Sequence, residues 1–235
     1  SFMAACVKLA AFGAMLRIMY VALGGLRWDW RSMFWVIAIL TMFVGVIIAL
    51  TQTDVKRMLA YSSIAHAGFL LIAVIATNEQ GIGGAMFYLL AYGVATIGAF
   101  GVVSLVRDST GEATHLSSWA GLGKRSPWVA GAFTIFLLSF AGIPLTAGFI
   151  GKFAVFEAGV AGGAGWLVVV AVIASAIAVF FYGRVIVIMF FTEPQADGPT
   201  VVIPSSFTAI AIAAGLALTI VLGIIPQPFL DLAEK

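Results

Sequence analysis

Seven long apolar segments, separated by short polar links, constrain the fold of this chain more than any other feature. An α-helix rises about 1.5 Å per residue, so each segment is long enough to cross the roughly 30 Å hydrocarbon core of a bilayer. The segments lie near residues 2–22, 33–51, 58–76, 82–106, 127–160, 166–191 and 205–225. The pattern predicts an all-α integral membrane protein in which residues 1–235 form a single bundle of about seven transmembrane helices.

The composition supports this class and argues against nucleic-acid binding. Hydrophobic residues make up 63% of the chain and charged residues 9%, with a mean hydropathy of +1.14. A soluble domain carries about 25% charged residues. The net charge is only +2, and the chain contains no basic run. The lipid bilayer is therefore a predicted partner, and nucleic acid is not.

Cysteine and histidine are too scarce to predict a metal or cofactor site in this chain. The single cysteine, Cys6, allows neither an intrachain disulfide nor a cysteine-ligated iron–sulfur cluster. His66 and His115 do not share a predicted helix, which argues against haem ligation by two histidines on one helix pair. The chain also lacks a glycine-rich dinucleotide turn between a strand and a helix. Any redox centre must therefore lie elsewhere.

The segment at 127–160 is too long for one straight helix across a bilayer. Its roughly 34 residues would extend about 50 Å as a helix. Gly142 and Pro144 predict a break, because proline lacks an N–H group and clashes with the preceding turn. The carbonyl groups released at the break must lie inside protein or beside a wet cavity. Lys152 follows eight residues after Pro144, and a broken helix beside an ion resembles the sites that transporters build near the midplane.

Two lysines, Lys8 and Lys152, are predicted to lie within the membrane. A lysine at the centre of a span costs about 2.5–3.5 kcal/mol and normally faces the bundle interior. Lys8 is interpreted either as a functional cation or as a structural residue bonded to backbone carbonyls. Lys152 lies beside the predicted break. Burial there would disfavour its charged form, whereas the released carbonyls would favour it. Such a balance would let it gain and lose a proton during function.

Three further ionisable residues are candidates for a proton relay. His66 lies in an apolar segment, and an imidazole with an ordinary pKa near about 6.5 suits proton transfer, although a hydrogen-bonded core histidine fits equally well. Lys56 lies at a helix end, where it is either a relay group or a positive-inside anchor. Glu157 follows Lys152 by five residues, a poor spacing for an intrahelical ion pair, so we expect it at another helix or the membrane edge. The hypothesis is a line of titratable groups made of Lys8, Lys56 with His66, Lys152, and Glu157 at the far end.

The polar links predict how the bundle is oriented and capped. Links 52–57, 107–126 and 192–204 share one side, called side two, which carries most basic loop residues. The positive-inside rule places side two in the cytoplasm and the C-terminus outside the inner (plasma) membrane. Asp54 is a predicted N-cap for the third helix, and a short surface helix is expected around 116–122. Because the chain begins inside an apolar helix, we expect it to be part of a longer membrane chain.

Two motifs resemble a known family. Residues 49–69 read ALTQTDVKRMLAYSSIAHAGF and are similar to the signature of the antiporter-like membrane subunits of respiratory complex I. Residues 138–153 read LSFAGIPLTAGFIGKF and resemble the discontinuous-helix signature of the same subunits. The similarity extends from the first residue to about residue 191.

This resemblance implies half of an inverted-repeat fold, with the last seven of about fourteen helices. It implies that Lys8 is a central connecting lysine, that Lys56 and His66 are intermediate relay groups, and that Lys152 is the exit-side lysine on the broken helix. The family also has an earlier Lys–Glu pair outside this sequence, so this chain alone would not form a complete pathway. Residues 82–106 carry neither the histidine nor the lysine of the two larger relatives. That departure favours the branch nearest the quinone-proximal part of the membrane arm.

The function that the resemblance implies is proton translocation by a non-redox subunit of NADH-quinone oxidoreductase, a translocase. FMN, iron–sulfur clusters and quinone would be bound by partner subunits, and the other membrane-arm subunits would be its partners. One alternative is a subunit of a multisubunit cation/proton antiporter or of a membrane-bound hydrogenase, against which the missing histidine and lysine argue. Another is a structural membrane scaffold for complex assembly, which leaves two costly buried cations unexplained.

Overall fold

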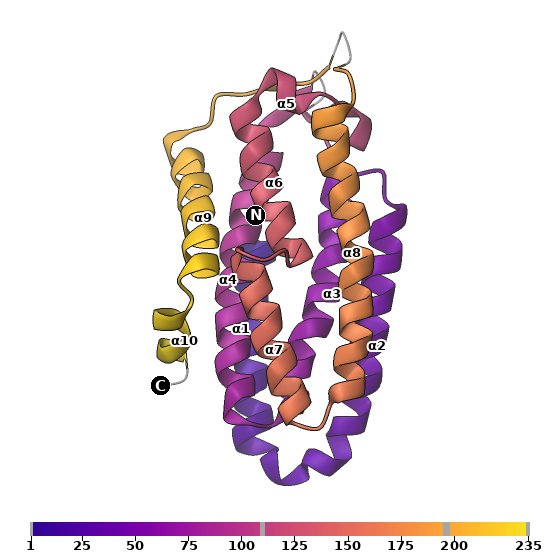
Figure 1. Cartoon of the computed structure of the whole chain (residues 1–235), viewed down its shortest axis with the longest axis vertical. Helices are drawn as coiled ribbons and strands as arrows, with labels where there is room; N and C mark the ends of the chain where they lie inside the picture. Colours follow the sequence, from indigo (N-terminus) through magenta and orange to yellow (C-terminus); the bar gives the residue numbers. More distant parts are fainter. Residues whose placement is uncertain (1, 109–110, 195–197, 234–235) are drawn as a thin grey trace.

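Six helices are long and apolar enough to cross a membrane in the computed structural model, which describes residues 2–108, 111–194 and 198–233. They run lengthwise beside one another in an elongated bundle (Figure 1). The six are α1 (Phe2–Arg17) with the π-helix Ile18–Ala22, α2 (Arg27–Thr51), α3 (Val55–Ala76), α4 (Glu79–Val103), α8 (Gly165–Phe191) and α9 (Ser206–Ile224). They match six of the seven predicted segments, and the membrane class is confirmed.

Two shorter helices occupy the remaining predicted segment, 127–160, and small elements lie in the links. The shorter helices are α6 (Pro127–Ala141) and α7 (Ala147–Ala161). The remaining elements are η2 (Gly24–Leu26), β1 (Val106–Asp108), β2 (Gly111–Glu112), η3 (Leu116–Trp119), α5 (Leu122–Arg125), β3 (Thr200–Val201) and α10 (Gln227–Ala233). The sequence pattern did not predict α10.

Short polar side chains cap the helices at the predicted links. The Asp54 carboxylate accepts a hydrogen bond from the backbone N–H of Arg57 at 2.9 Å, so its role as N-cap of α3 is confirmed. The Asn78 side chain accepts from the N–H of Gly81 at 2.8 Å and begins α4 in the same way. Pro127 lies at the start of α6, where its missing N–H costs nothing. These residues determine where each polar link ends and the following helix begins.

The link between the predicted segments 2–22 and 33–51 is largely helical. Helix α2 begins at Arg27, about two turns before the predicted start at residue 33. Asp29 lies in its first turn, where a negative charge favours the positive end of the helix dipole. The indole of Trp30 is buried and donates a hydrogen bond to the carbonyl of Leu23 at 3.0 Å. Trp30 therefore packs as part of the bundle, whereas Trp28 is exposed on the first turn of α2.

A small antiparallel sheet, which the sequence did not predict, joins two of the links on side two. Its strand order is β2-β1-β3, with Arg107 paired with both Glu112 and Thr200. The link expected to form a surface helix around 116–122 forms η3 and α5 instead, and Leu116 and Trp119 are buried there. Residues 195–197 of the predicted loop at 193–199 lie outside the described residues.

Helices α3 and α4 form the centre of the bundle. About 72% of the α3 span and 67% of the α4 span is buried, against 17% for the span that contains α1. Helix α3 packs against α2, α4, α7 and α8, while α9 lies to one side against α4 and α7 (Figure 1). At Gly45 of α2 a side chain would clash with the backbone of Tyr61 and Ala65 on α3. Small residues thus let the helices pack closely, which favours their association in a bilayer, where the hydrophobic effect does not drive helices together.

Candidate proton-relay site

Residues 142–146, between α6 and α7, are not helical and contain both Gly142 and Pro144. Gly142 has a φ of 81°, a left-handed conformation that favours glycine. Its N–H donates to the carbonyl of Ser139, and the N–H of Ile143 donates to that of Leu138, both at 3.0 Å. These two bonds form a Schellman motif. In Figure 1, α7 continues below α6 after this irregular segment.

Lys152 lies on α7 and reaches back to the end of α6. Its side chain is 4% exposed, and its Nζ donates to the carbonyls of Phe140 at 2.8 Å and Ala141 at 3.0 Å. A third hydrogen bond, of 2.8 Å, goes to the hydroxyl of Ser175 on α8. With the two Schellman bonds, all of the last four carbonyls of α6 have partners.

The ammonium group of Lys152 is therefore held by uncharged oxygens in the described structure. It lies at the C-terminal end of α6, where the helix dipole is negative and favours a cation. A carboxylate would fix the charge more firmly than carbonyl and hydroxyl dipoles do. A cavity of about 310 Å³ beside Lys152 is lined by Ser175 and by apolar residues such as Phe153 and Val179. This setting suits a group that exchanges a proton.

Lys8 points from α1 toward α3 and α4, as expected for a charge inside a bundle. Its half-buried Nζ donates to the carbonyl of Ser63 on α3 at 2.6 Å and lies 5.0 Å from the ring centre of Tyr92 on α4. A cavity of about 390 Å³ adjoins it, lined in part by Ser63 and Thr96. A structural lysine would make the same carbonyl contact, so the geometry fits both interpretations of Lys8.

His66 lies near the middle of α3 and is only 2% exposed. Its Nδ1 is hydrogen-bonded to the hydroxyl of Tyr88, and its Nε2 to that of Tyr182 at 3.3 Å. The rings of Tyr92 and Phe140 lie 4.6 and 5.8 Å away, centre to centre. One aromatic ring lies between His66 and each lysine. The ring centre of Phe69 is 5.6 Å from that of His66 and 5.1 Å from Nζ of Lys152. Tyr92 is likewise near both His66 and Lys8. The structure thus brings the buried His66 and Lys152 and the half-buried Lys8 into one region of the bundle.

Several polar residues of this region were missed by sequence reasoning. Tyr88 and Tyr92 lie four residues apart on α4, and Tyr182 lies on α8. Three of the five tyrosines of the chain therefore gather around His66. Ser62 hydrogen-bonds Tyr182, as Ser175 does Lys152. The i, i+4 tyrosine pair in a span was the one available signal, because both hydroxyls point from the same helix face.

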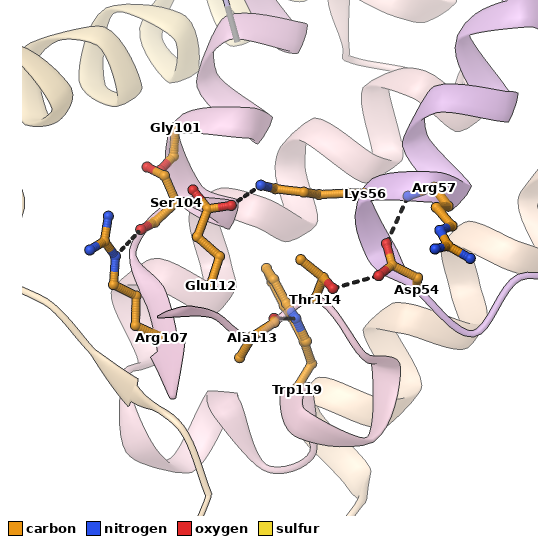
Figure 2. A network of polar contacts seen from close by, with 10 residues as sticks. All are labelled: Asp54, Lys56, Arg57, Gly101, Ser104, Arg107, Glu112, Ala113, Thr114 and Trp119. Atoms are coloured by element: carbon orange, nitrogen blue, oxygen red, sulfur yellow. Dashed lines mark hydrogen bonds and ion pairs between the residues drawn. The ribbon is translucent and has the colours of Figure 1, made fainter. Parts of the chain in front are cut away.

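Lys56 lies apart from this buried region, at the side-two surface. Its ammonium forms an ion pair with Glu112 of β2, and the two side chains are 40% and 30% exposed. Figure 2 shows this pair beside the Asp54 cap, whose carboxylate also accepts a hydrogen bond from Thr114. The contacts tie the start of α3 to the link at 107–126. The structure does not bring Lys56 into contact with His66.

The remaining predicted positions are also exposed. Glu157 lies exposed on α7, on the far side of Lys152 from the break. His115 is exposed at the start of η3 and does not share a helix with His66. Within residues 2–108, 111–194 and 198–233, no group of three or more His, Cys, Asp or Glu side chains is placed to bind a metal.

Comparison with known proteins identifies the family. The family described as "NADH:quinone oxidoreductase/Mrp antiporter, TM" matches residues 1–178 of the 235. The chain belongs to this family. It is 65% identical over 234 residues to NADH-quinone oxidoreductase subunit N 3 of Streptomyces griseus, covering 100% of this chain and 42% of that relative. It is 66% identical over 235 residues to subunit N of Rhodococcus opacus, covering 100% of this chain and 44% of that relative.

A solved structure extends the likeness to three dimensions. The fold is similar, with a TM-score of 0.79 and 32% identity, to a chain of respiratory complex I from Thermus thermophilus with bound aureothin. The match covers 94% of this chain and 48% of that one. The chain thus spans less than half the length of the curated relatives it matches. Both relatives are named subunit N, so the branch favoured by the missing histidine and lysine is confirmed.

Proposed function

We propose that this chain forms the proton-conducting half of a subunit N of NADH-quinone oxidoreductase, and that it moves protons without carrying a redox group. The observation that carries the proposal is the buried ammonium of Lys152, bonded to two end carbonyls of α6 and to Ser175. A lysine held only by neutral dipoles has no fixed counter-charge. Its proton affinity therefore responds to any nearby change of charge.

The proposed relay runs from Lys8 through His66 to Lys152. A single aromatic ring separates His66 from each lysine, Tyr92 for Lys8 and Phe69 for Lys152. A change of charge at one of these groups therefore acts on the next. Lys56 collects protons at the side-two surface, where Glu112 holds it. Glu157 receives protons beyond Lys152, toward the opposite side. Apolar helices insulate this line from bulk water.

In the proposal, helices α6 and α7 together form one discontinuous span, which brings the number of spans from six to seven. The N-terminal end of α6 lies with the side-two links, and α7 ends near the turn into α8 on the opposite side (Figure 1). With side two in the cytoplasm of a plasma membrane, the C-terminus lies outside. The non-helical residues between the two helices supply carbonyl ligands at mid-membrane.

The partners in this proposal are the other membrane-arm subunits, which complete the enzyme. FMN, the iron–sulfur clusters and quinone are held by partner subunits. The Lys–Glu pair that the family resemblance implies lies in the other half of the longer chain. Electron transfer in those partners changes charges that the relay senses, and the coupling to this chain is electrostatic.

The test replaces each buried lysine in the full-length subunit within the assembled enzyme. Lys152→Ala and Lys8→Ala are expected to reduce NADH-driven proton uptake by inverted membrane vesicles by at least about tenfold. The amount of assembled complex on native gels is expected to fall much less. The control is Lys124→Ala, an exposed lysine on α5, which is expected to leave both readouts unchanged. Undiminished pumping by assembled Lys152→Ala enzyme would remove the assignment.

A structural scaffold is the second candidate, favoured by one observation. Both buried lysines bond backbone carbonyls, which a purely structural lysine would also do. This candidate predicts loss of assembly, without loss of pumping per assembled complex, in the same two variants. The antiporter alternative is separated by co-purification, because an antiporter subunit would not copurify with flavin and iron–sulfur subunits.

A further inference from the structure

Four buried side chains form one unbroken hydrogen-bond chain across three helices. Ser62 bonds Tyr182, Tyr182 bonds Nε2 of His66, and Nδ1 of His66 bonds Tyr88. Ser62 and His66 lie on α3, Tyr182 on α8 and Tyr88 on α4. Each of the four side chains is at most 2% exposed. We call these four residues the hydroxyl chain.

One residue intervenes between each end of the hydroxyl chain and one of the two lysines. Ser62 immediately precedes Ser63, whose carbonyl accepts the hydrogen bond of Lys8. At the other end, the Tyr88 ring packs against Gly151, so closely that a side chain at 151 would clash with it. Gly151 is the direct neighbour of Lys152. The hydroxyl chain therefore extends from the residue next to the Lys8 acceptor to a ring that packs against the residue next to Lys152.

Every member of the hydroxyl chain can both accept and donate a proton. A hydroxyl accepts on its oxygen while it donates its own hydrogen, and an imidazole accepts at one nitrogen while it releases from the other. When a proton enters at Ser62, the hydroxyl hydrogen of Ser62 passes to Tyr182, and that of Tyr182 passes to Nε2 of His66. The hydrogen on Nδ1 then passes to Tyr88, whose own hydrogen leaves. One proton enters, one leaves, and each group keeps its original number of protons.

We propose that Tyr182 is a relay residue that carries protons between Ser62 and His66 and so links Lys8 to Lys152. The inference rests on the proposed proton-translocating function and deepens it. Tyr182 is the residue of α8 that closes the gap between two α3 side chains one helical turn apart. Without its hydroxyl, the described chain from Ser62 to His66 is interrupted.

The test uses Tyr182→Phe in the full-length subunit within the assembled enzyme. This change removes one oxygen and keeps the ring that packs against Phe140 and Phe181. NADH-driven proton uptake by inverted vesicles, per assembled complex, is expected to fall by at least about tenfold, since positioned proton transfer contributes about 10²- to 10⁴-fold. Ser62→Ala is expected to lower it in the same direction. The matched control is Tyr61→Phe, a half-buried tyrosine of α3 outside the hydroxyl chain, which is expected to pump normally.

A second measurement separates proton transfer from packing. Difluorotyrosine placed at 182 keeps the hydroxyl and its bonds but makes the phenol more acidic. If Tyr182 carries protons, the pH profile of pumping shifts toward lower pH; a merely structural hydroxyl leaves the profile unchanged. Should Tyr182→Phe fail to assemble, Ser62→Ala and the difluorotyrosine profile decide the question. Normal pumping by Ser62→Ala with an unshifted profile overturns the inference, whereas normal pumping by Lys152→Ala overturns the proposed function instead.

Discussion

Lys152 and Lys56 are the same side chain in two opposite settings. Lys152 is 4% exposed and held by carbonyl and hydroxyl oxygens at 2.8–3.0 Å. Lys56 is 40% exposed and paired with the carboxylate of Glu112. An exposed ion pair of this kind contributes little to stability, because water screens both charges. Neutral dipoles in a buried site keep a cation whose proton can be displaced.

The difference shows that the ability of a lysine to exchange its proton depends on the charge of its neighbour as much as on its burial. Both lysines are predicted relay residues, yet only Lys152 lies near His66 and Lys8 in the described structure. At the surface, water and Glu112 can replace Lys56 in collecting protons. In the core, the Ser175 hydroxyl also donates to the carbonyl of Ala141, at 3.4 Å, but it carries no charge that could replace the ammonium of Lys152.

Replacing each lysine by methionine is expected to give the largest contrast. Lys152→Met is expected to lower NADH-driven proton uptake about a hundredfold per assembled complex, because it deletes a proton carrier. It also leaves the carbonyls of Phe140 and Ala141 without the ammonium, at a cost of about 1–3 kcal/mol for each buried carbonyl left unsatisfied. Lys56→Met is expected to change uptake less than about threefold, because surface water substitutes for it. Equal losses in the two variants would erase the distinction between the sites.

Gly142→Ala is expected to disturb the Lys152 site without touching the lysine. The φ of 81° at Gly142 is strained for alanine by about 1–2 kcal/mol. The added Cβ would also lie 3.0 Å from Cδ and 3.2 Å from Nζ of Lys152. We expect a lower thermal unfolding temperature of the detergent-solubilised enzyme and pumping reduced severalfold. The control is Gly183→Ala on α8, where a Cβ meets no atom within 4 Å; an equal effect there would show that the break is not special.

Ser175→Ala is expected to have a smaller effect on the same site. It removes the third hydrogen bond of Lys152 and keeps both carbonyl bonds, so about 1 kcal/mol of stabilisation is lost. Pumping is expected to fall a fewfold, and Ser175→Thr, which keeps a hydroxyl, is expected to restore most of it. The measurement is the initial rate of proton uptake at several pH values. An unchanged pH profile in Ser175→Ala would mean that the serine does not influence the lysine.

The sequence predicted the elements of the buried site better than their contacts. Hydropathy marked the spans, and Gly142 and Pro144 marked the non-helical residues 142–146, because a missing N–H and a left-handed conformation are local properties. The bond between Ser62 and Tyr182 joins residues 120 positions apart, and no local pattern records such a meeting. The helix moment of a buried span is weak, so its polar face is not visible in the sequence.

The surface around Lys56 was predicted less well than the core. The strands β1, β2 and β3 have two or three residues each, too few for an alternating pattern to appear. The sheet places Glu112 against Lys56, a pairing that no local sequence pattern indicates. At the opposite end of the bundle, α2 begins earlier than predicted, where Trp30 donates a hydrogen bond to the carbonyl of Leu23. Short-range rules fail where a few tertiary contacts decide the structure.

Glu112→Gln is expected to have the smallest effect and to sharpen the comparison from the Lys56 side. It removes the charge of the partner and leaves a hydrogen-bonding side chain, so stability is expected to change by less than about 1 kcal/mol. The effect should shrink further as salt is raised, because an exposed pair is screened over about 10 Å at 0.1 M. Thermal unfolding of the solubilised enzyme at low and high salt measures both. A salt-independent loss of proton uptake in Glu112→Gln would contradict the expectation that surface water can replace this pair in collecting protons, and would make the pair essential for proton entry.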